Sequence, residues 1–186
     1  MSRRAWAENA DAALAAVGLL WLVFLADKVI PADLRGLGIR PRQISGATGI
    51  LFCPFLHASL AHLAANSVAL FVLLMLSLSL GRGLTLEVVI LTAGIGGSLV
   101  WLLGRSGTVY VGASGVIFGF IGFLLAFGLL RMALRPVLVS LVVFALYGGS
   151  LLTLLRNQPG VSWLAHVGGF VAGVMSAWWM RNAPAR

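Results

Sequence analysis

The chain has 186 residues, of which 60% are hydrophobic and only 10% are charged, and its mean hydropathy is +1.03. Soluble domains carry about 25% charged residues, so this composition excludes a soluble enzyme, a disordered chain and a collagen-like fibre, and it indicates an integral membrane protein. Thirteen basic residues face five acidic ones. They are scattered singly, so we expect them to contact lipid head groups and not nucleic acid. The single cysteine, Cys53, excludes an intramolecular disulfide and a cysteine cluster, and we expect no metal or cofactor.

The gaps between charged residues place the predicted helices, because a membrane helix needs about 20 apolar residues. A β-barrel is excluded because the apolar segments are continuous and do not alternate with polar residues. We therefore expect an all-α, polytopic membrane protein that forms a single domain over residues 1–186. The six predicted spans are 12–30, 60–80, 86–104, 114–130, 136–155 and 163–180.

The first predicted span shows no small-residue cleavage site at its end, so we expect a retained helix and not a cleavable signal peptide. The segment 31–59 is predicted to be a long loop, because Gly46, Gly49 and Pro54 interrupt its apolar run. Its apolar residues place the loop partly in the bilayer.

Two polar side chains stand at the start of the second predicted span. His62 and Asn66 are four residues apart, so they share one helix face and can direct hydrogen-bond donors at one point. A helix–helix hydrogen bond is the alternative interpretation of a histidine at membrane depth.

A short Gly-Ala-Ser-Gly segment, Gly112–Gly115, leads into the fourth predicted span. The two glycines let the backbone turn tightly and let a ligand approach. Ser114 would lie beside the unpaired N–H groups and the positive end of a helix, which stabilise an oxyanion. An ordinary N-cap serine is the alternative.

An activated serine needs a base within hydrogen-bond reach, and His166 is the histidine outside the 57–66 cluster. Glycines spaced four apart, in 115–119 and 169–173, would let the fourth and sixth spans approach closely. The second pair lies on the same helix face as His166, so this contact would direct His166 toward Ser114. The five acidic residues lie outside the apolar cores, so we expect a Ser–His dyad without a third, acidic member.

Three motifs together resemble the rhomboid family of intramembrane serine proteases. They are Phe55–Asn66 (FLHASLAHLAAN), Gly112–Gly115 (GASG) and Ala165–Gly169 (AHVGG). Their order and spacing are like those of the family, and the likeness runs from about Gly38 to Trp179.

The resemblance implies a role for each matching residue. Ser114 would be the nucleophile and His166 the general base, which later acts as acid to the leaving amine. His62 and Asn66 would hold the oxyanion together with the Ser114 N–H group. His57 would be structural, and supporting positions around the substrate cavity are Gly112, Gly115, Phe118 and His57.

The resemblance also implies a substrate and a location. The protein would cleave transmembrane segments of membrane-protein substrates near the membrane surface, at sites preceded by a small side chain. We expect a polar cavity that opens outward with Ser114 at its floor, and the span 136–155 and the loop 156–162 match the family's gate and cap. We also expect a minimal six-span core in a bacterial plasma membrane with both termini cytoplasmic, although basic residues favour that side by only seven to six. Nothing in the sequence predicts an oligomeric state.

Three departures from the family pattern stand out. Phe118 replaces a tyrosine that is common in the family, the second span lacks a late glutamate, and the first loop lacks a Trp-Arg pair. The last change questions how that loop is anchored. The alternatives are an inactive rhomboid-like protein that binds client helices, and a small transporter or channel, which the absence of repeats and embedded charges disfavours.

Overall fold

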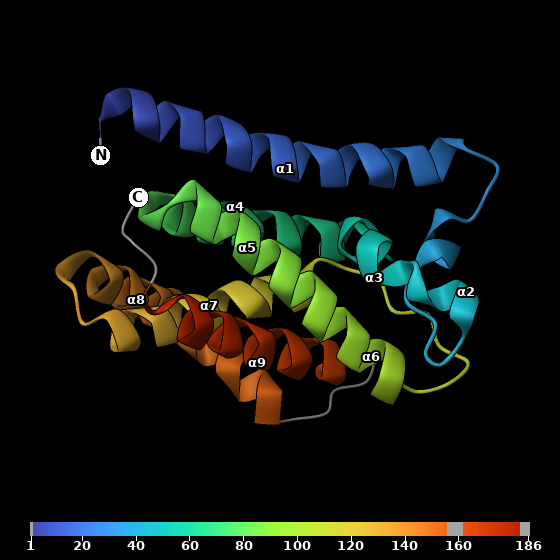
Figure 1. The fold of residues 1–186 in the computed structure, drawn as a ribbon. Coiled ribbons are helices and arrows are strands. Elements are labelled where there is room, and N and C mark those ends of the chain that lie inside the picture. Colours follow the sequence, from blue (N-terminus) through green and yellow to red (C-terminus); the bar gives the residue numbers. More distant parts are fainter. Residues whose placement is uncertain (1, 156–161, 183–186) are drawn as a thin grey trace.

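The computed structural model describes residues 2–155 and 162–182, and within them the chain forms a helical bundle without a β-sheet. A single antiparallel bridge joins Ile39 and Tyr110. Figure 1 shows the arrangement of the long helices. They are α1 (Arg3–Val29), α4 (Leu60–Leu80), α5 (Arg82–Leu91), α6 (Gly97–Leu103), α7 (Ser114–Arg131), α8 (Leu134–Tyr147) and α9 (Trp163–Met180).

Helix length and composition agree with the expected all-α membrane fold. Among the described residues, five segments are long and apolar enough to cross a membrane: Arg3–Val29, Leu60–Leu80, Arg82–Leu103, Ser114–Arg131 and Leu134–Leu155. The sixth predicted span is α9, which has 18 residues, as α7 does. It contains a histidine, glycines and tryptophans, which lower its mean hydropathy. The protein is therefore a multi-pass membrane protein built as a helical bundle.

The predicted bounds of two segments need correction. Helix α1 begins at Arg3 and not at residue 12, because the Ser2 hydroxyl caps it by accepting a hydrogen bond from the Ala5 N–H at 3.2 Å. The charged residues near the N-terminus therefore limit the apolar part of the helix and do not end the helix itself. The segment 136–155 is α-helical only to Tyr147 and continues as the 3₁₀ helix η4 (Gly148–Leu155).

The predicted loop 31–59 also contains regular structure. It holds short helices and turns: η1 (Leu34–Leu37), α2 (Ile44–Ala47), α3 (Gly49–Phe52) and η2 (Cys53–Phe55). Gly46 and Gly49 do not break these helices. A methyl group at either position would overlap the backbone of residues 38–40, so the glycines let the short helices pack directly against that segment.

One end of the bundle carries the start of α1 and the end of α9, and the other carries the long connecting segments. Arg82, the first residue of α5, donates hydrogen bonds to Glu8 at 3.2 Å and to Asn9 at 3.3 Å near the start of α1. Arg131, at the end of α7, donates to the Arg181 carbonyl at 2.9 Å just after α9. The start of α1 and the end of α9 thus lie at one end of the bundle (Figure 1). We call this the N-terminal end, and we call the opposite end, which carries residues 30–59 and 104–113, the loop end.

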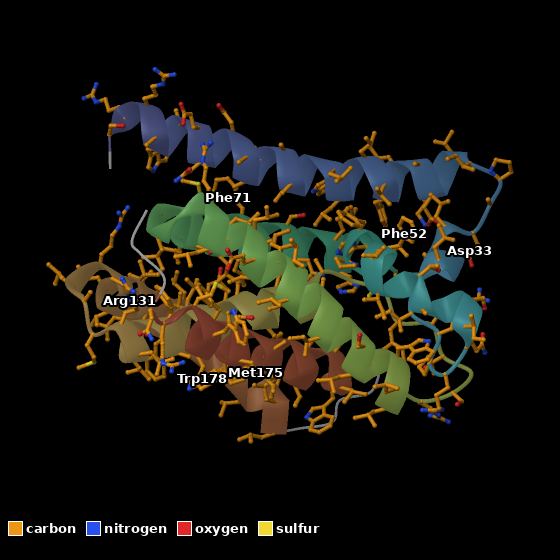
Figure 2. All side chains as sticks on the ribbon, in the orientation of Figure 1. Asp33, Phe52, Phe71, Arg131, Met175 and Trp178 are labelled. Atoms are coloured by element: carbon orange, nitrogen blue, oxygen red, sulfur yellow. The ribbon has the colours of Figure 1, made fainter. Side chains whose placement is uncertain are left out.

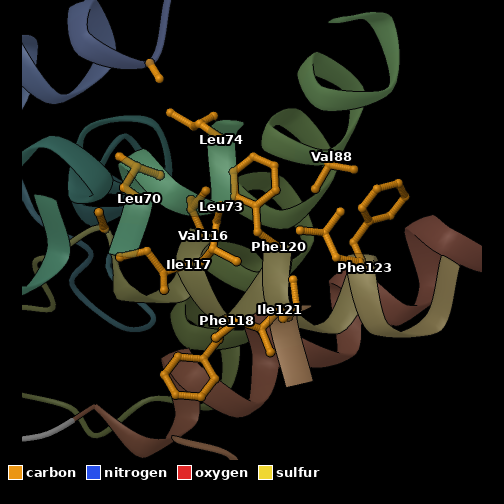
Figure 3. Packing of buried hydrophobic residues seen from close by; sticks show 14 of the residues in the cluster. Leu70, Leu73, Leu74, Val88, Val116, Ile117, Phe118, Phe120, Ile121 and Phe123 are labelled. Atoms are coloured by element: carbon orange, nitrogen blue, oxygen red, sulfur yellow. The ribbon is translucent and has the colours of Figure 1, made fainter. Parts of the chain in front are cut away.

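Helix α7 is the centre of the bundle. In it, 61% of the residues are buried, against 11% in the most apolar 18-residue stretch of Leu134–Leu155. Figure 3 shows Phe120 and Phe123 of α7 packed near Leu73 of α4 and Val88 of α5. On the outer surface, apolar side chains such as Met175 and Trp178 point away from the bundle (Figure 2), where a membrane protein meets lipid.

The third crossing contains one wide turn. Between α5 and α6, the segment η3 (Thr92–Gly96) forms a π-helix. The Thr92 hydroxyl donates to the Val88 carbonyl at 2.7 Å, and Thr92 packs against Gly119 of α7. Gly96 faces Gly169, where an added methyl group would lie 3.3 Å from the Gly169 backbone. Such single π turns often occur where a helix passes a functional site.

Candidate functional site

The contact between α7 and α9 decides where the candidate site lies. A methyl group at Gly169 would overlap the Gly115 carbonyl oxygen, and one at Gly173 would overlap the Gly119 carbonyl oxygen. The main chains of the two helices therefore touch, which confirms the predicted contact between the two glycine pairs. Since His166 lies one turn before Gly169, this contact brings it beside the start of α7.

A cavity of about 1230 Å³ opens at the loop end of the bundle, where α7 and α9 begin. It is lined by residues from α4, α7, α8 and α9 and from the chain between α6 and α7. Ser114, His166, His62 and Asn66 all line it. The structure thus brings the four residues singled out in the sequence to one space, although they come from three separate helices.

Ser114 is the first residue of α7, as the sequence predicted. The chain before it turns at Gly112, whose φ of +123° lies in the region that favours glycine. A methyl group at Gly112 would lie 2.6 Å from the His62 Cε1 atom, so this glycine also lets the His62 ring approach the backbone. The Gly112 N–H donates to the Cys53 carbonyl at 2.9 Å, which ties this turn to η2.

His62 and Asn66 lie on the cavity side of α4, and Ser59 caps that helix by accepting from the His62 N–H at 3.2 Å. The Asn66 Nδ2 atom lies 3.0 Å from the His57 Nε2 atom. Because an amide nitrogen only donates, His57 accepts through Nε2 and is neutral in this arrangement. The second Asn66 N–H remains for the cavity.

His57 supports both donors from behind. It is 2% exposed, and its ring lies edge-on to the His62 ring with centroids 5.1 Å apart. Burial, helped by the charge of nearby His62, lowers the pKa of His57 from 6.5 to about 4. His57 is therefore an uncharged hydrogen-bond acceptor at neutral pH. Its structural role, which the resemblance implied, is to hold the Asn66 side chain in place.

His166 is buried, and Phe118 stacks on it with ring centroids 4.2 Å apart and an interplanar angle of 17°. The ring that replaces the family's tyrosine therefore keeps the stacking contact. The buried His166 Nδ1 atom has no hydrogen-bond partner in the described chain, and no acidic residue lines the cavity. No hydrogen bond joins Ser114 to His166 within the described residues; such bonds often tighten only in the substrate complex.

Comparison with known proteins decides the family. A rhomboid domain profile matches residues 45–183. This chain belongs to the rhomboid family. The match begins after η1, so it covers α3 and η2 of the first loop and every described residue that lines the cavity.

Individual relatives of this rhomboid fall into two groups. An uncharacterized protein of Mycobacterium tuberculosis is 40% identical over 194 residues, covering 99% of this chain and 80% of the relative. An uncharacterized protein of Mycobacterium leprae is 37% identical over 192 residues, covering 99% and 76%. RHOMBOID-like protein 4 of Arabidopsis thaliana is 29% identical over 145 residues, covering 76% of this chain and 36% of its own.

The first loop of this rhomboid is anchored to α6 and to the residues just after it, which the sequence did not indicate. The Arg42 guanidinium donates to the Leu102 carbonyl at 2.9 Å and to the Ser106 hydroxyl. The Trp101 indole donates to the Gln43 carbonyl at 2.9 Å. An arginine and a tryptophan thus hold this loop, but the tryptophan comes from α6. The doubt raised by the missing adjacent Trp-Arg pair is resolved, because the two residues are 59 positions apart and no local motif could show them.

Other parts of the cavity wall were not singled out in the sequence. Tyr147 and Ser150 line it from the segment matched to the family's gate, and Tyr110 and Arg105 line it from the chain before α7. The segment matched to the cap, 156–162, lies outside the described residues except for Ser162. Among the described residues, no group of three or more His, Cys, Asp or Glu side chains is placed to hold a metal ion.

Proposed function

We propose that this rhomboid is an intramembrane serine endopeptidase that cleaves transmembrane segments of membrane proteins with a Ser114–His166 dyad. The observation that carries the proposal is the convergence of Ser114, His166, His62 and Asn66 on one cavity at the loop end of the bundle. Hydrolysis within a membrane requires water and polar groups at a depth where backbone groups are otherwise shielded. A cavity lined by hydroxyl, imidazole and amide groups supplies them.

The proposed reaction is acyl transfer. The Ser114 Oγ atom attacks the scissile carbonyl carbon while His166 takes the hydroxyl proton. Negative charge develops on the carbonyl oxygen, where the Ser114 N–H, His62 and the second Asn66 N–H would stabilise it. The C–N bond then breaks as His166 gives its proton to the leaving amine, and water releases the acyl group by the same steps in reverse. Each well-placed oxyanion donor contributes about 10²–10³-fold in rate.

A backbone edge beside the cavity would receive the unwound substrate. In the bridge between Ile39 and Tyr110, the Tyr110 N–H donates to the Ile39 carbonyl at 2.9 Å and the Tyr110 carbonyl accepts from the Ile39 N–H at 3.0 Å. The N–H and carbonyl groups of the neighbouring residues Val109 and Val111 therefore face the other side. Both residues line the cavity, and no backbone hydrogen bond to either is present within the described residues. Addition of an extended peptide to such an edge is a common form of recognition.

The test is cleavage of a single-span protein in liposomes. Ser114→Ala and His166→Ala should each abolish cleavage, whereas Ser79→Ala, a change on α4 away from the cavity, should leave it unchanged. A fluorophosphonate probe should label the wild-type protein and not Ser114→Ala. Cleavage that survives in Ser114→Ala would refute the proposal.

One observation favours a second candidate, an inactive rhomboid-like protein that binds client helices. The described residues contain no Ser114–His166 hydrogen bond and no partner for the His166 Nδ1 atom, so the base lacks the polar orienting group found in triads. This candidate predicts that wild-type protein binds a membrane-spanning peptide but is not labelled by the fluorophosphonate probe.

The proposed location is a bacterial plasma membrane with both termini in the cytoplasm. The mycobacterial relatives support the location. The N-terminal end of the bundle carries Arg3, Arg4, Arg82, Arg131, Arg135 and Arg181, in keeping with the excess of basic residues on the cytoplasmic side. Single cysteines at positions 133 and 107, in a Cys53→Ser background, should react with an impermeant maleimide from the inside and the outside of cells, respectively.

A further inference from the structure

The cavity wall contains one residue of fixed charge. Arg105 is the only Asp, Glu, Lys or Arg residue among those that line the described cavity. Its backbone takes part in hydrogen bonds, but its guanidinium makes none within the described residues and enters no ion pair there. Among the other described cations of the loop end, Lys28 and Arg35 pair with Asp27, and Arg42 anchors the first loop. Arg40, whose buried Nε has no hydrogen-bond partner in the described chain, does not line the cavity.

The backbone that carries Arg105 is held on several sides. The Arg105 N–H donates to the Tyr110 hydroxyl at 2.9 Å, and the Thr108 hydroxyl donates to the Arg105 carbonyl at 2.6 Å. The Arg42 guanidinium also bonds to residues on both sides of Arg105, the Leu102 carbonyl and the Ser106 hydroxyl. The charge is thus attached to a fixed turn at the edge of the cavity, and less conformational freedom is lost when it binds a ligand.

The chemistry of this position favours a carboxylate. A guanidinium presents paired N–H donors that match a carboxylate in two parallel hydrogen bonds. No acidic side chain of the described chain lies in the cavity to occupy them, since Glu8, Asp11 and Glu87 belong to other parts of the bundle and Asp27 and Asp33 pair near η1. The partner must therefore come from another molecule.

We infer that Arg105 is a specificity-determining residue that binds an acidic side chain of the substrate, close to the scissile bond in its sequence. The inference rests on the proposed protease function. A substrate strand paired with the edge at Val109 and Val111 would run between Ser114 and Arg105. Arg105 and Ser114 line the same cavity, so the acidic residue should stand within about six positions of the cleaved bond, roughly 20 Å of extended chain at ~3.3 Å per residue.

The experiment compares two single-span substrates that differ only by Asp or Asn at each position within six residues of the cleavage site. Cleavage is measured in phosphatidylcholine liposomes at low salt. At one position, wild-type protein should cleave the Asp substrate about two- to fivefold faster, the range expected for a partly exposed ion pair. Arg105→Gln should remove this ratio, and Arg105→Glu should favour a Lys substrate at the same position. Arg35→Gln, which removes the same charge at the same end of the bundle but outside the cavity, should keep it.

Several outcomes would overturn the inference while leaving the protease function intact. They are an Asp/Asn ratio of one at every position, a ratio that survives in Arg105→Gln, and an effect of Arg105→Gln seen only when phosphatidylglycerol is added, which would assign Arg105 to lipid head groups. If the wild-type protein cleaves neither substrate, the protease function fails. Binding of the fluorescent Asp and Asn peptides to Ser114→Ala, with and without Arg105→Gln, then tests the charge preference alone, and equal affinities would refute it.

Discussion

Replacing Gly169 by alanine should separate α9 from α7 and disable the proposed dyad, whereas the same change at Gly168 should be tolerated. The two glycines are neighbours in one helix, so alanine changes their helix propensity equally. Their surroundings differ. A methyl group at Gly169 would overlap the Gly115 carbonyl oxygen, but one at Gly168 would lie 3.5 Å from the Gly96 carbonyl oxygen, an ordinary contact.

The magnitude follows from that overlap. The atom in the way is backbone and not a flexible side chain, so the helices must move apart, at a cost of about 1–3 kcal/mol for an overpacked contact. Alanine returns about 0.5–1 kcal/mol through its better helix propensity, so the net loss of stability should be at most about 2.5 kcal/mol. Since His166 lies one turn away from the overlap, it should move relative to Ser114. A displacement of about 1 Å at a reacting pair costs about 10²-fold in rate.

The assay measures kcat/KM on a single-span substrate in liposomes together with the thermal unfolding midpoint in detergent. Gly169→Ala should lose about 10²-fold in kcat/KM while still unfolding cooperatively, and Gly168→Ala should stay within about threefold of wild type. If Gly169→Ala retains wild-type activity, or if both variants lose activity equally, direct main-chain contact does not set the position of His166.

Three further predictions concern the groups around the dyad. Phe118→Ala should lower kcat/KM by about 2- to 12-fold, because an aromatic pair contributes about 0.5–1.5 kcal/mol. Phe118→Tyr keeps the ring and should retain activity. Equal losses in both variants would contradict a stacking role. Arg42→Gln should lower the free energy of unfolding by about 1–3 kcal/mol because two bonds of the first loop are lost, and Arg42→Lys should not restore it, as chemical denaturation in detergent can check. The pKa of His57 is about 4 in the folded protein and 6.5 ordinarily. Between these pH values the unfolded chain binds more protons than the folded chain, so the free energy of unfolding falls as the pH is lowered from 6.5 to 4. The loss is at most about 3 kcal/mol. His57→Gln should flatten that dependence in thermal unfolding measured across this range, and an unchanged slope would show that another group is responsible.

The site's main geometry could be predicted because it depends on short-range regularities. Residues four apart share a helix face, so the pairing of His62 with Asn66, and of Gly169 with Gly173, can be read from spacing alone. Glycine pairs at that spacing on two apolar helices then predict close contact. The start of α7 at Ser114 followed from the glycines around it in the same way.

Contacts between distant segments could not be predicted by such rules. Nothing in the neighbourhood of Arg42 indicates that its partners lie on α6 and just after it. The bond between His57 and Asn66 depends on how the chain turns before α4, which no periodicity describes. From sequence alone the glycines of the first loop predict helix breaks, because their other role, direct packing against the backbone of residues 38–40, is visible only in the folded chain.

The π turn at η3 should let the third crossing tolerate the deletion of one residue. A single π turn holds one residue more than an α-helical turn, and the helix on either side keeps its orientation. Deletion of Gly94, which has open space around it, would convert the turn to regular α-helix and leave Val88 facing the core and Trp101 facing the first loop. A one-residue deletion within α6 would instead rotate everything after it by about 100° and detach Trp101 from Gln43. Length variation in the third crossing is therefore expected to accumulate within residues 92–96.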